Sequence, residues 1–294
     1  MSINYQELVP EMALGKEISR HIFQTYRAKT ELPHEIEQNI EHIKRLNPEY
    51  EYHLFDDEDI KAFILEHYGE VIWGYYQRIA PIYGAARADF FRYLLVYQLG
   101  GVYIDIKSSL DKPLKDVLRP EDQFILTHWD NRPGEQYEGI GIYPELGTLP
   151  RGEYIQWCIA SVAGHPILRA VILQMLRNID EYTPFRHGAG LWGVLRTTGP
   201  VMYTKVIEAM RPTLIEGKDY RMLDKPQEIG LRYSIFDTAG VYGHKKALKA
   251  NYNKAYTPII VTPDRPLYAK CAKYYLFARL AIRVLGDKIA ARFK

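Results

Sequence analysis

The stretch from Ala85 to Ser109 constrains the fold most, because it joins an unbroken helical run to a double glycine and a short alternating segment. Residues 85–99 are rich in Ala, Leu, Phe and Tyr and hold no helix breaker, and Pro81 suits a first helical turn, so a helix is expected here. Gly100-Gly101 then predicts the left-handed cap with which helices end. A helix followed at once by a strand is typical of an α/β fold.

Residues 102–107 alternate with the period of a strand. Strand geometry places alternate residues on opposite faces, which predicts one apolar face to be packed and one face to present an aromatic ring, an acid and a base. The two faces are Val102, Ile104 and Ile106 on one side, and Tyr103, Asp105 and Lys107 on the other.

Asp89 and Arg92 are three residues apart on the preceding helix and therefore share a face. If this helix packs on the strand, both charges approach the strand end that carries Asp105. An acid for sugar hydroxyls, an Arg fork for phosphate and a carboxylate at a strand end together predict a sugar-nucleotide site. The alternative is a solvated surface ion pair beside an edge strand.

The run A-A-R-A-D-F-F-R, followed by L-G-G-V-Y-I-D, resembles the signature of glycosyltransferase family 32, whose sugar-binding region contains a DXD motif. It also resembles the glucosyltransferase domains of large clostridial toxins. The resemblance implies an α/β GT-A fold, with a Rossmann-like, mainly parallel sheet flanked by helices. It implies that Asp89 and Arg92 bind the donor sugar and phosphate, that Tyr103 lies by the nucleotide, and that Asp105 contacts ribose, sugar or metal-bound water.

The triplet Asp105-Ile106-Lys107 departs from the family pattern, because Lys107 replaces the acid that usually binds a divalent cation. Such a cation, Mn²⁺ or Mg²⁺, stabilises the charge on the leaving diphosphate. Three interpretations of this replacement follow. Lys107 supplies part of that positive charge and acts with Arg92 and Asp105 in catalysis, other ligands such as His244 join Asp105 on a metal, or activity is lost.

Other segments also resemble the family. Residues 18–26 are predicted as the first strand, whose end enters the nucleotide pocket and supplies Gln24, Thr25 and Tyr26 as donor-binding candidates; a buried strand with a polar end is the alternative. Thr198 precedes a helix start and is a candidate for the donor or for a cap. His244 corresponds to a loop that folds over the donor diphosphate, and a solvated basic loop is the alternative.

The remaining pattern predicts an alternation of helices and strands after a loose leader over residues 1–16. Asp56 opens a run of four acids, and the spacing favours the acidic first turn of a helix over a calcium loop. Helices are expected at 32–46, 60–67, 167–179 and up to 210, and strands at 50–55, 123–128, 154–162 and within 229–242.

Composition is that of an ordinary globular enzyme, with 47% hydrophobic residues, 25% charged residues and a formal net charge of +2. Cys158 and Cys271 lie far apart, which gives neither a disulfide framework nor a zinc motif. No targeting or membrane-spanning segment is recognised, so a cytoplasmic enzyme is expected. Nucleic acid is not expected as a partner.

The segment 265–294 is strongly basic, with Asp287 as its only acid, and its apolar residues recur at helical spacing. We expect a basic amphipathic helix, separate from a glycosyltransferase domain over 1–264. It either packs on that domain or lies on an anionic membrane surface.

Together with the family resemblance, these observations predict an enzyme of polysaccharide biosynthesis that moves a hexose from a UDP- or GDP-sugar to a hydroxyl of a glycan or lipid-linked acceptor. The resemblance implies retention of configuration. Two rivals stay open: a non-catalytic protein that binds sugar nucleotides or glycans, and a membrane-surface module whose working part is the basic helix.

Overall fold

The computed structural model describes residues 3–147, 149–236, 257–261, 271, 274–276 and 278. A four-stranded sheet with the order β2-β1-β3-β6 lies at its centre. The pairs β1–β2 and β1–β3 are parallel, and β6 is antiparallel to β3. The predicted α/β class with a mainly parallel sheet is therefore confirmed. The strands are β1 His21–Thr25, β2 Glu51–Phe55, β3 Gly101–Ile104 and β6 Cys158–Ser161.

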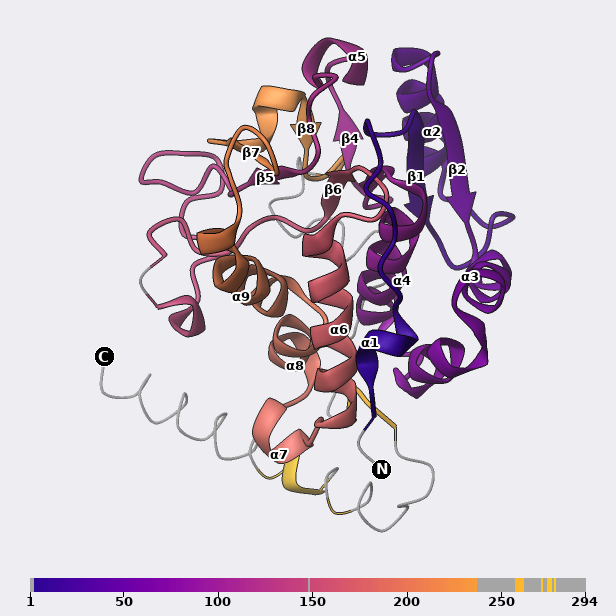
Figure 1. Ribbon diagram of the computed structural model, residues 1–294, viewed down its shortest axis with the longest axis vertical. Coiled ribbons are helices and arrows are strands. Elements are labelled where there is room, and N and C mark those ends of the chain that lie inside the picture. Colours follow the sequence, from indigo (N-terminus) through magenta and orange to yellow (C-terminus); the bar gives the residue numbers. More distant parts are fainter. Residues whose placement is uncertain are drawn as a thin grey trace.

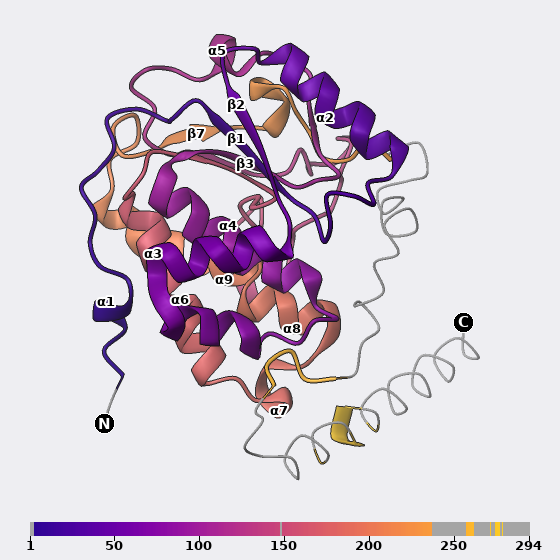
Figure 2. The same ribbon diagram turned by 90° about the vertical axis from the view of Figure 1, so that its right-hand side faces the viewer.

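Helices cover both faces of this sheet (Figures 1 and 2). One face carries α2 (His34–Leu46), and the other packs against the group α3 (Asp57–Arg78), α4 (Gly84–Leu99), α6 (Pro166–Asp180), α8 (Gly190–Thr197) and α9 (Pro200–Met210). Figure 2 shows the resulting layers edge-on.

Smaller elements complete the described fold. Two further two-stranded sheets pair β4 (Ser109–Leu110) with β8 (Leu231–Arg232) and β5 (Ile125–Thr127) with β7 (Arg221–Leu223). The short helices are α1 Tyr5–Leu8, α5 Leu114–Val117, α7 Pro184–His187, and the 3₁₀ turns η1 Pro144–Leu146, η2 Arg211–Thr213 and η3 Pro226–Ile229.

Strand β3 is buried on both faces. Val102 and Ile104 pack into the apolar layer beneath α2, whereas Tyr103 packs into the larger layer formed with α3, α4 and α6. The predicted alternation is thus present. The expectation that the second face would be open is wrong for Tyr103, because the α4 layer covers it.

Gly100 is the C-cap of α4 and Gly101 begins β3, so the helix ends at the glycine pair as predicted, and both glycines have positive φ, +66° and +98°. The ψ of −167° at Gly100 is not that of the predicted left-handed cap. A Cβ at Gly100 would lie 2.7 Å from the backbone nitrogen of Ala163, and one at Gly101 would lie 2.9 Å from the carbonyl oxygen of His21. The two glycines therefore permit both the turn and the close approach of neighbouring backbone.

Five local predictions need correction. Pro81 lies in a turn before α4, which begins only at Gly84, and α3 runs on past residue 67 with a non-helical Gly69 inside it. The leader is not loose throughout, since α1 contacts α6. The strands predicted at 123–128 and 154–162 shorten to β5 and β6.

The acidic run at Asp56 is a capping box. The Asp56 side chain accepts hydrogen bonds from the backbone of Glu58 and Asp59, and the Asp59 side chain accepts one from the Asp56 backbone. These carboxylates satisfy the unpaired N–H groups at the start of α3, as predicted. Within the described residues, no helix is long and apolar enough to cross a membrane.

Candidate functional site

Asp105 lies immediately after β3, at the carboxyl end of the parallel strands. Its backbone N–H donates to the carbonyl of Trp157 (2.8 Å), and its carbonyl accepts from the N–H of Ser108 (2.8 Å). This turn ends the strand at Ile104, so the predicted strand over 102–107 is too long. The turn nevertheless brings Lys107 back to Asp105.

Asp89 and Arg92 lie in the middle of α4 and contact the same carboxylate. Arg92 Nη2 is 3.3 Å from Asp89 Oδ1 and 2.9 Å from Asp105 Oδ1. The side chains of both α4 residues are only 4% exposed. The surface ion-pair alternative is therefore wrong, and the helix charges meet the strand end as the sequence analysis required.

Lys107 completes a cluster of two acids and two bases. Its Nζ lies 2.5 Å from Asp105 Oδ2 and 4.4 Å from the centre of the Tyr233 ring. Arg92 lies 4.7 Å from the centre of the Tyr103 ring. Each cation thus contacts an aromatic face as well as Asp105, which favours the charged form of both bases.

Two neutral side chains also donate hydrogen bonds to Asp89. Gln156 Nε2 donates to Asp89 Oδ1 (3.0 Å), and Thr198 Oγ1 donates to Asp89 Oδ2 (2.9 Å). Burial raises the pKa of Asp89 to about 6, although Arg92 and these hydrogen bonds favour its charged form. Asp89 therefore changes its charge close to neutral pH.

Burial also affects the pKa of the two bases, and the net shift differs between Lys107 and Arg92. Burial lowers the pKa of Lys107, and the ion pair with Asp105 offsets this only in part. Burial alone would also lower the pKa of Arg92, but Asp105, Asp89 and the neighbouring tyrosines together outweigh it, so the Arg92 pKa is raised. Arg92 is thus the permanent cation of the cluster, and Lys107 is the more easily deprotonated one.

The end of β1 supplies the polar residues next to Asp105. Gln24 Nε2 donates to the Asp105 carbonyl (3.0 Å), and Thr25 Oγ1 lies 3.1 Å from the Tyr103 hydroxyl, which in turn donates to Asp105 Oδ1 (3.4 Å). Tyr26 is half-buried beyond them. All three residues predicted from this strand therefore lie at the same sheet edge.

The cluster has an inner and an outer part. Gln24 and Thr198 are fully buried, and Asp89 and Arg92 are nearly so, whereas the Asp105 side chain is 21% exposed and that of Lys107 is 9% exposed. Asp105 is thus the member of the cluster that solvent reaches most. The buried members hold its position.

Thr198 does not cap α9, because Gly199 occupies the N-cap position and α9 has no side-chain cap. Its hydroxyl instead donates a hydrogen bond to the Asp89 carboxylate. The capping alternative is therefore wrong, and the structure places this threonine in the cluster.

Two residues of the cluster have no counterpart in the sequence predictions. Gln156 links Asp89 to the Tyr93 hydroxyl and accepts from Arg92 Nη1 through its carbonyl (2.7 Å). Tyr52 donates its hydroxyl to Gln24 Oε1 (2.7 Å). Gln156 was visible as an isolated polar residue within the apolar run Y-I-Q-W-C-I-A, a signal that marks buried polar networks.

The described residues at Asp105 do not fit a divalent cation. Of the two carboxylates, Asp89 is buried and paired with Arg92, and each oxygen of Asp105 already contacts a cation, Arg92 or Lys107. His244, the other predicted metal ligand, lies outside the described residues. In the described part of the chain, three potential ligands approach closely enough to share one ion only at His21, Glu51 and His53, at the opposite end of β1.

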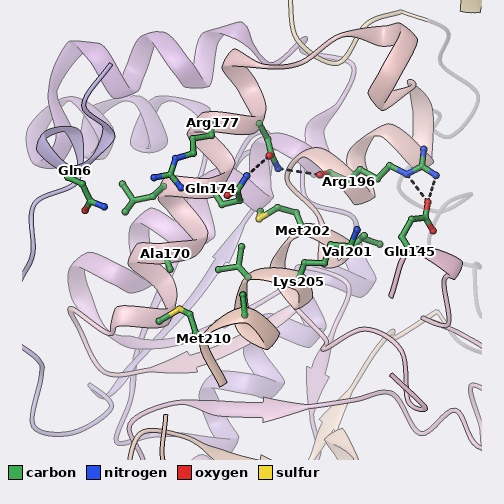
Figure 3. Close-up of a pocket in the computed structure, with 14 residues that line it drawn as sticks. Gln6, Glu145, Ala170, Gln174, Arg177, Arg196, Val201, Met202, Lys205 and Met210 are labelled. Atoms are coloured by element: carbon green, nitrogen blue, oxygen red, sulfur yellow. Dashed lines mark hydrogen bonds and ion pairs between the residues drawn. The ribbon is translucent and has the colours of Figure 1, made fainter. Parts of the chain in front are cut away.

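A pocket of about 610 Å³ lies between α6 and α9 (Figure 3). Figure 3 shows Arg196 paired with Glu145 at one end and Met210 at the other. On α9 the pocket is lined by Val201, Met202 and Lys205, whereas Tyr203 stacks on Tyr93 and Thr204 accepts from the Tyr154 backbone. The helix therefore separates this pocket from the Asp89 side, and none of the described lining residues is a predicted site residue.

Comparison with known proteins identifies the segment that carries the cluster. Residues 33–125 match the family described as glycosyltransferase sugar-binding region containing DXD motif. The matched segment is about a third of the chain, and it contains Asp89, Arg92, Tyr103, Asp105 and Lys107.

Curated relatives of the chain are fungal mannosyltransferases. The initiation-specific alpha-1,6-mannosyltransferase of Schizosaccharomyces pombe is 29% identical over 179 residues, which cover 55% of this chain and 42% of that protein. Inositol phosphoceramide mannosyltransferase 2 of the same organism is 33% identical over 165 residues, covering 56% and 40%. The chain thus spans about two fifths of the length of these relatives.

Two solved structures are also similar. The PaToxG glycosyltransferase has a TM-score of 0.48 and 16% identity, and the match covers 92% of this chain and 90% of that one. The glycosyltransferase domain of the YGT toxin, solved with UDP bound, has a TM-score of 0.41 and 10% identity, with 82% and 88% covered.

Proposed function

We propose that the protein is a glycosyltransferase that moves a hexose from a nucleoside-diphosphate sugar to a hydroxyl group of a glycan or lipid-linked acceptor. The observation that carries this proposal is the contact of Arg92, Lys107 and Asp105 at the carboxyl end of β3, inside the segment that matches the sugar-binding family. Ligands of open α/β sheets bind at this edge.

The cluster suits a donor that is both anionic and rich in hydroxyl groups. Asp105 accepts hydrogen bonds from sugar or ribose hydroxyls, while Arg92 and Lys107 provide positive charge for a diphosphate. Asp89 orients Arg92, and the buried Tyr103 packs against Arg92. The half-buried Tyr26 offers aromatic surface beyond the end of β1. In this assignment Gln24, Thr25 and Thr198 position the donor-binding groups.

The relatives guide the choice of sugar and acceptor. Those reported above are named mannosyltransferases, one initiation-specific and one acting on inositol phosphoceramide. We therefore propose mannose as the transferred hexose. A glycan and a lipid-linked hydroxyl are the two acceptor classes to be tested.

The proposed chemistry is a front-face displacement with retention of configuration. The bond from the anomeric carbon to the diphosphate oxygen breaks, the acceptor oxygen bonds to the same face of that carbon, and the acceptor proton passes to the departing phosphate. The protein supplies placement and positive charge where the leaving group becomes negative. Lys107 and Arg92 provide that charge directly in this proposal, since the described residues do not fit a divalent cation there.

A donor panel tests the function. Hydrolysis of UDP- and GDP-sugars is measured with purified protein in Mn²⁺ and in chelator, and one mannosyl donor should turn over at similar rates in both. Lys107→Ala should lower kcat about 10²-fold, the usual cost of losing one charge-stabilising donor. Lys112→Ala, which removes an exposed lysine nearby, is the matched control.

Two outcomes would contradict the proposal. Donor binding by calorimetry without turnover for any sugar would identify a non-catalytic binding protein. Full turnover that requires Mn²⁺ and survives Lys107→Ala would refute the role of Lys107 as the substitute for the cation.

A further inference from the structure

The amino ends of β1 and β2 carry a second cluster, remote from Asp105. His21 and Glu51 open these parallel strands and are direct partners in the register, and His53 pairs with Phe23 two residues further on. Because side chains alternate along a strand, all three residues project from the same face of the sheet. Asp105 follows the opposite, carboxyl end of the parallel strands.

The three side chains converge on one point. His21 Nδ1 lies 3.1 Å from His53 Nε2, and the two nitrogens lie 3.8 and 3.6 Å from oxygens of Glu51. All the potential ligand atoms lie within 4.8 Å of one another. A zinc ion with bonds of about 2.0–2.1 Å places two tetrahedral ligands roughly 3.3 Å apart, so the imidazole spacing already fits.

Solvent reaches the three side chains, and the Glu51 carboxylate is free to change its position. The side chain of Glu51 is 69% exposed, and those of His21 and His53 are 36% and 30% exposed. Binding of a shared ion therefore requires a small movement mainly of Glu51, the most exposed of the three side chains.

The donor set selects the class of metal. Two imidazole nitrogens and one carboxylate suit Zn²⁺ and its neighbours Co²⁺ and Ni²⁺, whereas Mg²⁺ and Ca²⁺ prefer oxygen ligands only. Three protein ligands leave a fourth position for water. An ion here would also join β2, the edge strand of the sheet, to β1.

We propose that His21, Glu51 and His53 bind one Zn²⁺ ion, which links the edge strand β2 to β1 and stabilises this end of the sheet. The proposal is independent of the glycosyltransferase assignment. It places the metal at the amino end of the parallel strands, away from Asp105.

Zinc binding by the full-length, tag-free protein after chelator treatment tests this proposal. Calorimetry should give one Zn²⁺ per chain, and Co²⁺ should give visible absorption of a low-symmetry site. His21→Ala and His53→Ala should each weaken Zn²⁺ binding at least 100-fold. Zinc should raise the unfolding midpoint of the natural protein and not that of either variant.

Two controls separate the proposed site from other binding. His34→Ala removes an exposed histidine that also has an acidic neighbour, Glu37, and it should leave the zinc affinity unchanged. Asp105→Asn should leave it unchanged too. The metal-free unfolding midpoint of each variant reports whether it folds. Absence of one-to-one binding at 100 µM Zn²⁺, or retained affinity in the folded double variant H21A/H53A, would overturn the proposal.

Discussion

The charge state of Asp89 is the residue-scale property on which the cluster depends. Its carboxylate orients Arg92, and burial raises its pKa to about 6. Between the ordinary value of 3.8 and about 6, the folded state holds a proton that the unfolded state has released. Stability therefore falls as the pH rises through this window. Donor turnover should instead fall as the pH drops through 6, because protonated Asp89 no longer pairs with Arg92.

Thr198→Val tests the environment of Asp89. The variant removes a hydroxyl that donates to the ionised carboxylate, so the Asp89 pKa should rise further and the acid limb of donor hydrolysis should move to higher pH. Carbon NMR titration of labelled aspartate measures the pKa directly. Thr213→Val, at an exposed threonine, is the control. An unchanged Asp89 titration in Thr198→Val would contradict the assigned hydrogen bond.

At the scale of elements, the junction between α4 and β3 determines where Asp89 and Asp105 meet. Gly100 has φ +66° and ψ −167°, and Gly69 within α3 has nearly the same conformation, φ +75° and ψ −177°. Both values fall in a region that only glycine adopts without strain. The two glycines differ in their surroundings, because a Cβ at Gly69 meets nothing within 4 Å.

Gly100→Ala should therefore destabilise the protein more than Gly69→Ala. Backbone strain costs about 1–3 kcal/mol at either position. At Gly100 the methyl group also meets the Ala163 backbone, and we expect a further loss of at least ~1 kcal/mol, as for other overpacked sites. Urea unfolding of the two variants measures the difference. Equal losses would show that the close backbone approach at residue 100 is readily relieved.

At the scale of the whole molecule, Asp180 connects three segments far apart in sequence. Asp180 ends α6, and its carboxylate accepts from the hydroxyls of Tyr5 in α1 (2.7 Å) and Tyr75 in α3 (2.5 Å). It also pairs with Arg78 (2.5 Å) at the end of α3. Burial would raise the pKa of Asp180, but these hydrogen bonds outweigh it and lower the pKa. This junction fixes the amino-terminal segment to the helical layer.

Asp180→Asn should lower the free energy of unfolding by about 2 kcal/mol at pH 7, in the range for charge-assisted hydrogen bonds. A lowered folded pKa gives stability that is present above the unfolded value and is lost as the pH falls through the folded value. The loss caused by the variant should therefore shrink in acid. Unfolding in urea at pH 7 and pH 3 measures it, with Glu181→Gln as the exposed control. A pH-independent difference would argue against the ion pair.

Much of the site could be predicted from the sequence because its main residues lie within one short stretch. The spacing of Asp89 and Arg92, the glycine pair and the strand that ends at Asp105 all follow from local rules of helix, cap and strand. These rules brought the three charges to one edge correctly. They did not determine the length of β3, because the turn at Ser108 depends on backbone contacts with Trp157 and other distant residues.

The sequence by itself determined the alternation of elements, the α/β class and the charged residues available at the end of β3. Only the tertiary structure decided that Gln156 and Thr198 meet Asp89, and that His21, Glu51 and His53 share one face. The physical reason is the distance along the chain over which each effect acts. Backbone preferences and periodicity act over a few residues, whereas burial, pKa and ligand geometry depend on which distant segments pack together.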